Sequence, residues 1–514
     1  MVIFLIFLFL IGVLYFSYSL LLKNLNYWKN RNVPYARPLP LFGNYKETLL
    51  LKKHIALVMR DMCQQFPNEP YFGSFYGTTP ALVVQDPNLL KLILSKEFYF
   101  CSGREASDYY GKEMIAKNLF LAYGDEWKVL RTNLTPLFSS VKLKNMFYLI
   151  KNCSDTLEKL LAEEFKLNPS IDIKSLLSRY TIDCITACAF GINSDSMGKN
   201  VHDNPFKKMG YKIFDTSDYQ ALKNICRSMW PGAFYALGYK VLNKDISSFF
   251  IELMSEVFQK REETNASKND FVDLIVGWKR DHHISGDSMS NLKTGDKKKI
   301  DIDVSNEFLV AQCVLFFAAG FETTATTTTF LLYELAKDKI AQEKVIAEVD
   351  EYFAKRDTVE FECINMMPYT EACLEESLRL YPVLGFLTRE VMDDYTLPTG
   401  YNFKKGDRIH IPVYQLQHSP DNFPEPDVFR PERFFGEEKK NIKPFTYMPF
   451  GEGPRTCIGM RFAKMPIYAG LLKIFKNYRV ELADNMPHKI TMDPKATVTQ
   501  HIGGIHLKFL PRET

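Results

Sequence analysis

The stretch Phe450-Gly451-Glu452-Gly453-Pro454-Arg455-Thr456-Cys457-Ile458-Gly459 places one cysteine in a glycine-rich loop that runs directly into a helical pattern. A thiolate at Cys457 would meet the N-terminal end of that helix, where unpaired backbone N–H groups and the helix dipole stabilise negative charge and lower the thiol pKa. Phe450 adds an aromatic face, Arg455 adds a cation, and Gly459 permits a close approach that a side chain would block. The stretch therefore predicts a site for an anionic sulfur ligand.

The spacing Phe-x-x-Gly-x-Arg-x-Cys-x-Gly resembles the haem-binding loop of the cytochrome P450 family, in which a cysteine thiolate is the axial ligand of the haem iron. A buried free cysteine is the alternative interpretation, and most cysteines of this chain are expected to be of that kind. Five matched positions around Cys457 disfavour it here. The resemblance implies the P450 fold, mainly α with small β-sheets, and haem b, iron protoporphyrin IX, as the cofactor.

Composition and charge narrow the classes of protein. The chain of 514 residues is 46% apolar and has no linker that cleanly divides it, which favours one large domain. Its formal charge of +3 is the small difference between 64 basic and 61 acidic residues, so no nucleic-acid partner is expected. The ten cysteines include no Cys-x-x-Cys pair, which disfavours a zinc site or a disulfide scaffold.

The N-terminal segment 2–22 carries no charged side chain. As a helix it would span about 31 Å at about 1.5 Å per residue, which matches the hydrocarbon thickness of a bilayer. A cleaved signal peptide is the alternative, but no basic start or cleavage site is evident. We therefore expect a transmembrane signal-anchor helix at 2–22, a basic, proline-containing hinge at 23–44 and a catalytic domain at 45–514. Because basic residues follow the anchor, the domain should face the cytosol, and the resemblance to microsomal P450s implies the endoplasmic reticulum membrane.

The pattern along the chain is mainly helical. Apolar periodicity predicts a hairpin at 71–84 and mostly helix between 86 and 279. The polar, lysine-rich segment 281–303 is expected to be a solvated loop. Further helices are expected at about 305–336, 341–353, 369–380 and 458–475, with short strands between 386 and 412 and a β tail at the C-terminus.

Within the long apolar helix, the run Ala319-Gly320-Phe321-Glu322-Thr323-Thr324 introduces an acid and an alcohol. The Thr323 hydroxyl can bond the carbonyl oxygen of Ala319, four residues back, and so open a groove for a small molecule and water. An ordinary helical Glu-Thr pair is the alternative. The run also resembles the oxygen-binding motif of the family, which implies that Thr323 steadies bound O2 while Glu322 relays protons.

A second constellation pairs Glu376 with Arg379, three residues later on the same helix face. Such pairs are common on surface helices. However, the segment Phe429-Arg430-Pro431-Glu432-Arg433-Phe434 resembles the family segment whose arginine completes a buried Glu-Arg-Arg cluster, which implies that Arg433 is the third member. We expect this cluster to hold the loop around Cys457 rather than to take part in chemistry.

A third constellation is a set of cations suited to an anionic cofactor. Trp127 and Arg131 lie four residues apart on one predicted helix face, where an indole N–H and a guanidinium suit a carboxylate. A solvated side chain is the alternative at each single arginine. By resemblance to the family, both residues would meet the haem propionates, as would three further arginines. The predicted haem site thus comprises Arg104, Trp127, Arg131, Arg389, Phe450, Arg455, Cys457 and Gly459.

The substrate-recognition segments of the family fall on residues 104–120, 206–214, 383–387 and 503–504, and on the long helix. They are rich in Phe, Leu and Val, which implies an apolar substrate held by shape with few polar anchors. Core packing is the alternative for each residue taken alone. The predicted substrate pocket comprises Phe120, Phe316, Phe317, Ala319, Thr324, Leu384, Phe386, Leu387 and Gly503.

Several segments, among them Leu134-Thr-Pro-Leu-Phe138 and Asp270-Phe-Val-Asp-Leu274, resemble microsomal insect P450s that metabolise xenobiotics. The resemblance implies a membrane-bound monooxygenase that inserts one atom of O2 into a hydrophobic small molecule such as a plant toxin or an insecticide. Oxidation of an endogenous hormone, sterol or fatty acid is the alternative. A reductase-independent haem-thiolate isomerase or dehydratase is a third interpretation.

The source of electrons is expected to be another protein, because the chain has no Gly-x-Gly-x-x-Gly nucleotide-binding unit. The resemblance implies NADPH–cytochrome P450 reductase, with cytochrome b5 as a further electron donor. The candidate docking cations for such a partner are Lys128, Lys443, Arg461 and Lys464. Ordinary solvated side chains are the alternative for these four residues.

Overall fold

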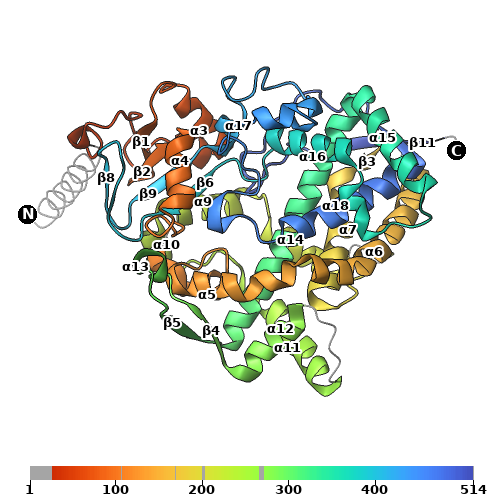
Figure 1. Cartoon of the computed structure of the whole chain (residues 1–514), viewed down its shortest axis with the longest axis horizontal. Helices are drawn as coiled ribbons and strands as arrows, with labels where there is room; N and C mark the ends of the chain where they lie inside the picture. Colours follow the sequence, from red (N-terminus) through yellow and green to blue (C-terminus); the bar gives the residue numbers. More distant parts are fainter. Residues whose placement is uncertain (1–25, 106, 168–169, 200–202, 265–270, 513–514) are drawn as a thin grey trace, which may run out of the picture.

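The structure is a computed structural model, and it describes residues 26–512 except 106, 168–169, 200–202 and 265–270. Helices fill most of the body, and strands gather mainly at one side of it (Figure 1). The mainly α class that the sequence predicts is therefore confirmed. The anchor expected at 2–22 lies outside the described residues.

The largest sheet has the strand order β1-β2-β9-β6, with β1 (Tyr71–Tyr76), β2 (Thr79–Val84), β9 (Arg408–Ile411) and β6 (Leu387–Glu390). β1 and β2 form the predicted hairpin, which turns at Gly77, where φ is +63° and glycine is favoured. β2 pairs in parallel with β9, and β9 pairs antiparallel with β6. β6 is therefore the edge strand of the sheet that lies toward the centre of the molecule (Figure 1).

A second sheet confirms the β tail at the C-terminus. It joins β10 (Tyr478–Leu482), β11 (His506–Pro511) and β3 (Ile171–Asp172). Because β3 directly precedes a long helix of the body, the C-terminal segment is packed against the helical core. β7 (Tyr395–Thr396) and β8 (Asn402–Phe403) form a short separate hairpin.

Helices account for most of the chain on both sides of residue 306. Before it they are η1 (Lys29–Arg31), α2 (Lys46–Leu49), α3 (Ile55–Cys63), α4 (Pro87–Lys91), η2 (Leu92–Lys96), η3 (Ser107–Lys112), η4 (Met114–Ala116), α5 (Gly124–Leu134), η5 (Thr135–Phe138), α6 (Ser140–Leu167), α7 (Ile173–Ile185), η6 (Thr186–Phe190), α8 (Pro205–Ile213), α9 (Asp218–Met229), α10 (Pro231–Ala236), α11 (Lys244–Thr264) and α12 (Phe271–Asp281). From it onward they are α14 (Asn306–Lys337), α15 (Lys339–Ala354), η7 (Phe361–Asn365), α16 (Pro368–Leu380), α17 (Val413–Gln417), η8 (Pro431–Phe434), η9 (Glu438–Asn441), η10 (Gly453–Arg455) and α18 (Met460–Asn477). The four long helices predicted after residue 304 are confirmed as α14, α15, α16 and α18.

Helix α14 crosses the middle of the molecule (Figure 1). The Ser305 side chain caps its start by accepting a hydrogen bond from the Phe308 N–H at 3.2 Å. At its end, Asp338 caps α15 by accepting from the Ala341 N–H at 2.9 Å. Among the described residues, α14 is the one helix long and apolar enough to cross a bilayer, but 67% of its apolar window is buried, as expected of a core helix.

The segment 281–303 is largely exposed, as predicted, but it is not a loop, and that part of the prediction is wrong. It forms a hairpin of β4 (His283–Asp287) and β5 (Lys299–Asp303), with the short helix α13 (Asn291–Thr294) between the strands. Ile284 is buried, and the Asp125 carboxylate of α5 accepts hydrogen bonds from the Ser288 hydroxyl at 2.8 Å and the Met289 N–H at 2.6 Å. The abundance of Lys, Asp and Gly concealed the alternation of apolar and polar residues in the two strands.

The described part of the predicted hinge, residues 26–44, packs on β1. Trp28 is 2% exposed, and its indole N–H donates to the Ser74 carbonyl oxygen at 2.9 Å. Gly73 leaves room for this ring, because a Cβ there would lie 2.3 Å from a Trp28 ring atom. This stretch is therefore attached to the catalytic body and is not a free spacer.

Candidate active site

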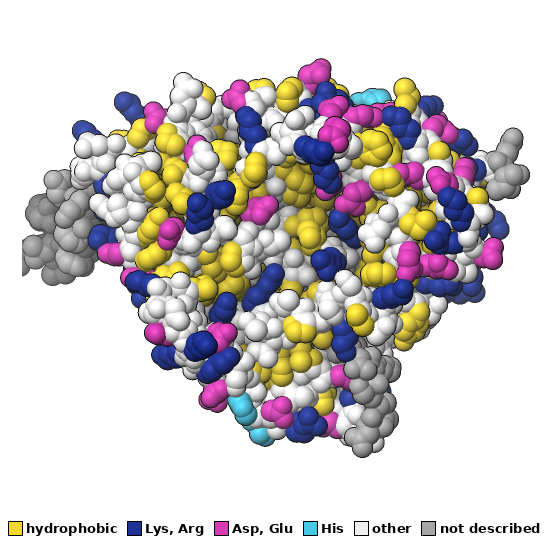
Figure 2. Space-filling view, viewed as in Figure 1, with side chains coloured by type: hydrophobic (Ala, Val, Ile, Leu, Met, Phe, Trp, Pro, Cys, Tyr) yellow, Lys and Arg dark blue, Asp and Glu magenta, His cyan; other side chains and the backbone are white. Residues whose placement is uncertain are grey.

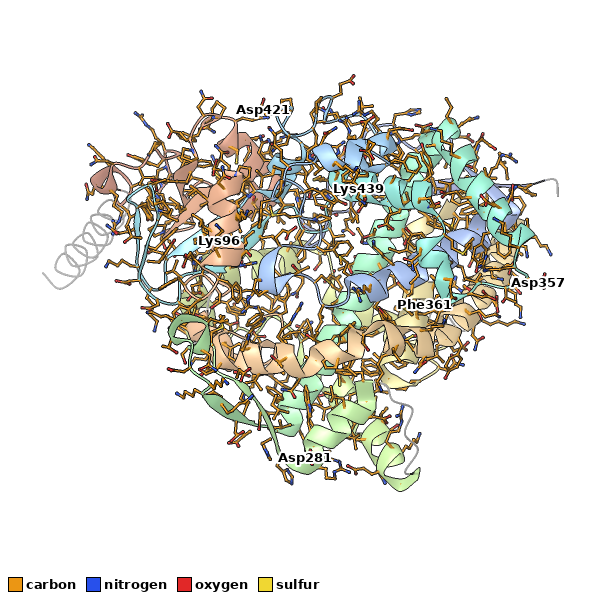
Figure 3. The ribbon with its side chains drawn as sticks, viewed as in Figure 1. Lys96, Asp281, Asp357, Phe361, Asp421 and Lys439 are labelled. Atoms are coloured by element: carbon orange, nitrogen blue, oxygen red, sulfur yellow. The ribbon has the colours of Figure 1, made fainter. Side chains whose placement is uncertain are left out.

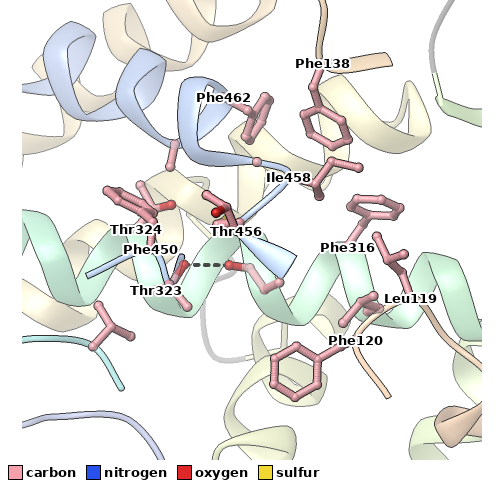
Figure 4. Close-up of a pocket in the computed structure, with 18 of the residues that line it drawn as sticks. Leu119, Phe120, Phe138, Phe316, Thr323, Thr324, Phe450, Thr456, Ile458 and Phe462 are labelled. Carbon is pink, nitrogen blue, oxygen red and sulfur yellow. Dashed lines mark hydrogen bonds between the residues drawn. The ribbon is translucent and has the colours of Figure 1, made fainter. Parts of the chain in front are cut away.

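The loop 450–459, which leads into α18, forms part of the wall of a cavity of about 290 Å³. Much of the remaining wall comes from α5, η5, η6, α14, β6 and α18, with Phe138, Phe316 and Phe450 among the residues that face the space (Figure 4). Every residue predicted for the haem site lines this cavity: Arg104, Trp127, Arg131, Arg389, Phe450, Arg455, Cys457 and Gly459. Segments that are far apart in the sequence therefore meet at one place, as expected.

A tight turn holds Cys457 at the cavity wall. Its backbone N–H donates to the Phe450 carbonyl oxygen at 2.9 Å and closes the loop. Gly453 has a φ of +74°, and a Cβ there would lie 1.8 Å from the Leu94 carbonyl oxygen of η2. Glycine is thus required at this position on two grounds, the backbone conformation and the close packing of the loop on η2.

The Cys457 side chain is exposed where it faces the cavity, but protein atoms surround the cavity wall in which it lies. Burial raises the pKa of its thiol, while the Gly459 backbone N–H and the Arg131 cation lower it, and burial has the larger effect. The lowered pKa that the sequence predicts is therefore wrong for the protein alone. A thiolate at this position would therefore need a further positive charge to stabilise it, such as a metal cation.

Arg455 ties the cysteine loop to the opposite wall. Its guanidinium donates to the carbonyl oxygens of Ser102 at 2.7 Å, Phe120 at 3.3 Å and Ala122 at 2.5 Å. The guanidinium also lies 4.8 Å from the centre of the Trp127 ring, a cation–π distance. Arg455 therefore connects three of the chain segments that form the cavity.

Four arginines that line the cavity, Arg104, Arg131, Arg389 and Arg455, form what we call the arginine rim. Within the described chain, the buried Nε atoms of Arg104 and Arg389 have no hydrogen-bond partner. Burial, with repulsion from Arg389, lowers the pKa of Arg104 to about 9, and burial lowers that of Arg389 to about 10. Such a cluster is stabilised by an anionic ligand, and the two propionates of haem fit it.

Thr323 faces the cavity from α14, and its Oγ1 donates to the Ala319 carbonyl oxygen at 2.7 Å (Figure 4). This is the hydrogen bond that the sequence predicts. Thr324 also lines the cavity, and its buried Oγ1 has no partner among the described residues. Gly320 allows α14 to pack closely on α7, because a Cβ there would lie 2.6 Å from the Ile185 side chain.

Glu376, Arg379 and Arg433 form the predicted buried cluster. Arg379 donates to both Glu376 oxygens, from Nε at 2.7 Å and from Nη2 at 2.9 Å, and Arg433 Nε donates to one of them at 3.3 Å. Arg379 also donates to the Gln417 carbonyl oxygen at 2.8 Å, and the Gln417 side chain accepts from the Met448 N–H at 3.0 Å. This chain of contacts ends beside the cysteine loop, so the cluster supports that loop.

The sequence also matches known proteins. A family model described as Cytochrome P450 matches residues 33–509. This chain belongs to the cytochrome P450 family. It is therefore a monooxygenase that uses haem iron. Among similar proteins are Cytochrome P450 6B1 of Papilio polyxenes, 33% identical over 98% of each chain, and Cytochrome P450 6j1 of Blattella germanica, 34% identical over 96% of this chain and 95% of the relative. Cytochrome P450 6B2 of Helicoverpa armigera is 32% identical over 98% of this chain and 97% of its own length.

In this P450, Glu322 does not line the cavity. Its carboxylate is 5% exposed and accepts a hydrogen bond from Lys174 Nζ at 2.6 Å, and the same Nζ donates to Gln500 Oε1 at 2.6 Å. Lys174 and Gln500 line a second, polar pocket of about 180 Å³, together with Thr326 and Thr329 of α14. The sequence predicts Glu322 as a proton relay beside Thr323. In the structure its carboxylate is instead bonded to Lys174, away from the cavity that Thr323 lines.

The structure places only some of the residues predicted for the substrate pocket at the cavity. Phe120, Phe316, Ala319, Thr324, Leu384 and Leu387 line the cavity of this P450. Phe317, Phe386 and Gly503 do not. Phe317 packs on Phe250 with ring centres 5.2 Å apart, Phe386 packs on His410 at 6.0 Å, and Gly503 lines the second pocket.

Sequence reasoning missed three aromatic residues of the cavity, Phe138, Phe271 and Phe462 of α18. Phe138 stacks on Phe316 with ring centres 5.8 Å apart, and Phe271 meets Phe316 at 4.6 Å. Phe138 belongs to a segment that already resembled the P450 family, and that resemblance was the available signal. Phe271 belongs to a second such segment, 270–274, but the resemblance alone does not place it at the cavity, where the packing of α12 on α14 brings it. No residue of the predicted segment 206–214 lines the cavity, and Phe206, which is buried, packs on Phe249 at 5.5 Å.

Proposed function

We propose that this P450 is anchored in the endoplasmic reticulum membrane and oxidises apolar xenobiotics with electrons from NADPH–cytochrome P450 reductase. The observation that carries the proposal is a cavity in which a loop cysteine and the arginine rim share the wall with an apolar, aromatic lining. We propose haem b as the cofactor, because its propionates suit the rim and its iron suits the thiolate.

Each residue of the cavity has a proposed part. Cys457 would bind the iron through its thiolate, and the rim arginines and Trp127 would hold the propionates. Bound haem supplies the activation of O2, and the thiolate favours cleavage of the O–O bond. The residues of the chain itself hold the substrate by shape, exclude water and deliver protons.

Proton delivery is the proposed part of Thr323 and Glu322. The Thr323 hydroxyl lines the cavity and is the nearer group, and it would donate there by turning its proton from the Ala319 carbonyl oxygen. Glu322 is bonded to Lys174, so a relay through its carboxylate requires that ion pair to open. Lys174 and Gln500 line the polar pocket on another side of α14. Glu322 would therefore receive its protons from that pocket, through Lys174.

Thr323→Val should separate NADPH consumption from product formation. The change removes a hydroxyl proton donor from the cavity, and a positioned donor typically contributes about 10²–10⁴-fold. We expect the product formed per NADPH to fall by about tenfold or more, with peroxide released instead. Thr328→Val is the matched control, because its hydroxyl donates to the Thr324 carbonyl oxygen at 2.9 Å but does not line the cavity. Equal coupling in the two variants would contradict the role of Thr323.

The proposed docking face for the reductase, and for cytochrome b5, surrounds the cysteine loop. Of the candidate cations, Lys464 pairs with Glu371 and Lys443 donates to a backbone carbonyl oxygen at 2.9 Å. The Lys464–Glu371 pair is partly exposed, with the two side chains 25% and 22% exposed, so an acidic partner would have to compete with Glu371 for Lys464. Lys96 of η2 and Lys439 of η9 are labelled in Figure 3, and Figure 2 shows further Lys and Arg side chains on the same face of the molecule, so we include Lys96 and Lys439 in the docking face.

The membrane anchor that we propose at 2–22 lies outside the described residues. The stretch after it is fixed to β1 through Trp28, so the anchor would join the catalytic domain at a defined place. We propose that the catalytic domain, residues 45–514, faces the cytosol, because basic residues follow the proposed span.

Turnover of a mixed substrate panel with reductase and NADPH tests the substrate class. We expect plant toxins and insecticides to be oxidised in preference to hormones, sterols and fatty acids. The reverse preference would assign the endogenous alternative. Conversion of a lipid hydroperoxide without reductase would instead support an isomerase or dehydratase. Such an enzyme would not need the Thr323 hydroxyl that lines the cavity.

A further inference from the structure

We propose that Gln312 is a positioning residue, which fixes one wall of the cavity and so sets the pose in which an apolar substrate is oxidised. The proposal rests on the function proposed above. Gln312 lies on α14, is fully buried and does not line the cavity itself. Its influence on a substrate would therefore act through the residues that it holds.

The Gln312 side chain joins α14 to the segment 117–120, which precedes α5. Its Oε1 accepts from the Leu119 N–H at 3.0 Å, and its Nε2 donates to the Lys117 carbonyl oxygen at 2.7 Å. Nε2 also donates to the Phe308 carbonyl oxygen of α14 at 3.1 Å. Both ends of the amide are thus occupied, and two of the three hydrogen bonds cross between the elements.

The segment held by Gln312 carries Leu119 and Phe120, which line the cavity. It has no regular strand or helix of its own, and alongside a few turn hydrogen bonds its backbone is held by side chains, with the Leu119 N–H and the Lys117 carbonyl oxygen bonded to Gln312. The Phe120 ring is 41% exposed and lies 3.9 Å from the Arg104 guanidinium, between the arginine rim and the apolar lining. A shift of this segment therefore changes the cavity where the cofactor and substrate regions meet.

Shape is the main means of recognition in an apolar cavity, and a misplacement of about 1 Å can cost about 10²-fold in rate. α14 supplies another part of the wall through Leu315, Phe316 and Ala319. Gln312 sets the distance between that part and Leu119, because its amide bonds directly to the Leu119 N–H. Loss of the amide would leave two buried backbone groups without a partner, and the segment would move to satisfy them.

Gln342 provides a matched control for a purely structural role. It is 3% exposed, and its Oε1 accepts from the Val480 N–H at 2.9 Å. Its Nε2 donates to the carbonyl oxygens of Leu335 at 2.8 Å and Val480 at 2.9 Å. Gln342 therefore makes an equivalent buried connection, between α15 and β10, at a place that lines neither of the two cavities described above.

The test compares Gln312→Leu with Gln342→Leu in the full-length holoenzyme. Both variants are expected to keep the CO-bound absorption of thiolate haem and to lose similar thermal stability. Only Gln312→Leu should weaken the binding of an oxidised panel substrate, measured by its spectral titration, by about fivefold or more, and change the ratio of its products. Gln312→Glu keeps the acceptor for the Leu119 N–H and should restore part of the parental ratio.

Two results would overturn the proposal. One is an unchanged dissociation constant and product ratio in Gln312→Leu, and the other is an equal change in Gln342→Leu. Failure of the proposed function is distinguishable, because it would appear in the parent protein as missing thiolate absorption or as no turnover with reductase and NADPH.

Discussion

Replacing Cys457 with alanine is expected to abolish turnover and to remove the absorption band of ferrous, CO-bound thiolate haem. Cys457 stands at the end of a loop closed by its own N–H, beside the arginine rim and at the start of α18. On our proposal, removing the sulfur would remove the thiolate that binds the iron, and with it the electron density that favours O–O cleavage. The measurements are the CO difference spectrum and product formation with reductase and NADPH.

Cys188 is the control for this prediction, because it also lines the cavity but lies on η6, outside the loop. Cys188→Ala should keep the thiolate band. Cys457→His should retain haem through a nitrogen ligand and shift the band to that of imidazole-ligated haem. A thiolate band that survives in Cys457→Ala would contradict the assignment, and its loss in Cys188→Ala alone would move the ligand to η6.

Glu376→Gln should produce the largest loss of stability. Glu376 is fully buried, and removing its charge leaves the cations of Arg379 and Arg433 buried without their counter-ion. Breaking a buried ion pair from one side costs about 3–5 kcal/mol. Because the cluster supports the cysteine loop through Gln417 and Met448, we expect the thiolate band to be lost at temperatures at which the parent retains it.

The matched control is Glu343→Gln, which breaks an exposed pair. Glu343 accepts from Arg479 at 2.8 Å and 3.0 Å, in a two-point geometry like that between Glu376 and Arg379. Exposed pairs contribute about 0–1 kcal/mol, so this variant should resemble the parent. Thermal decay of the CO-bound spectrum measures both variants. Equal decay would show that burial of the cluster does not support the loop.

Local spacing was enough to predict the cysteine loop, the Thr323 hydrogen bond and the Glu376 cluster. Each depends on residues close together in the sequence or on a segment that resembles the family. Which residues of α14 face the cavity depends also on their rotation around the helix axis. Successive helix residues are rotated by about 100°, so Phe316, Ala319 and Thr323 share one face of α14, while Phe317 and Glu322 are turned away from it.

Strand geometry explains Phe386 by the same reasoning. Adjacent strand residues point to opposite faces, so Leu387 at the start of β6 reaches the cavity while its neighbour Phe386 packs on His410. The pairing of Glu322 with Lys174 joins residues 148 positions apart, and only the fold brings them together. A rule of helical rotation applied to the sequence would have separated Phe317 from Phe316, but it would not have identified Lys174.

The monooxygenase account is tested most directly with isotopically labelled O2. The purified protein, its reductase, NADPH and a substrate from the panel are incubated under labelled O2, and the product is analysed by mass spectrometry. The account predicts one labelled oxygen atom in each product molecule, with none formed when reductase, NADPH or O2 is omitted. An unlabelled product, or the same product formed from a hydroperoxide without O2 and reductase, would contradict it.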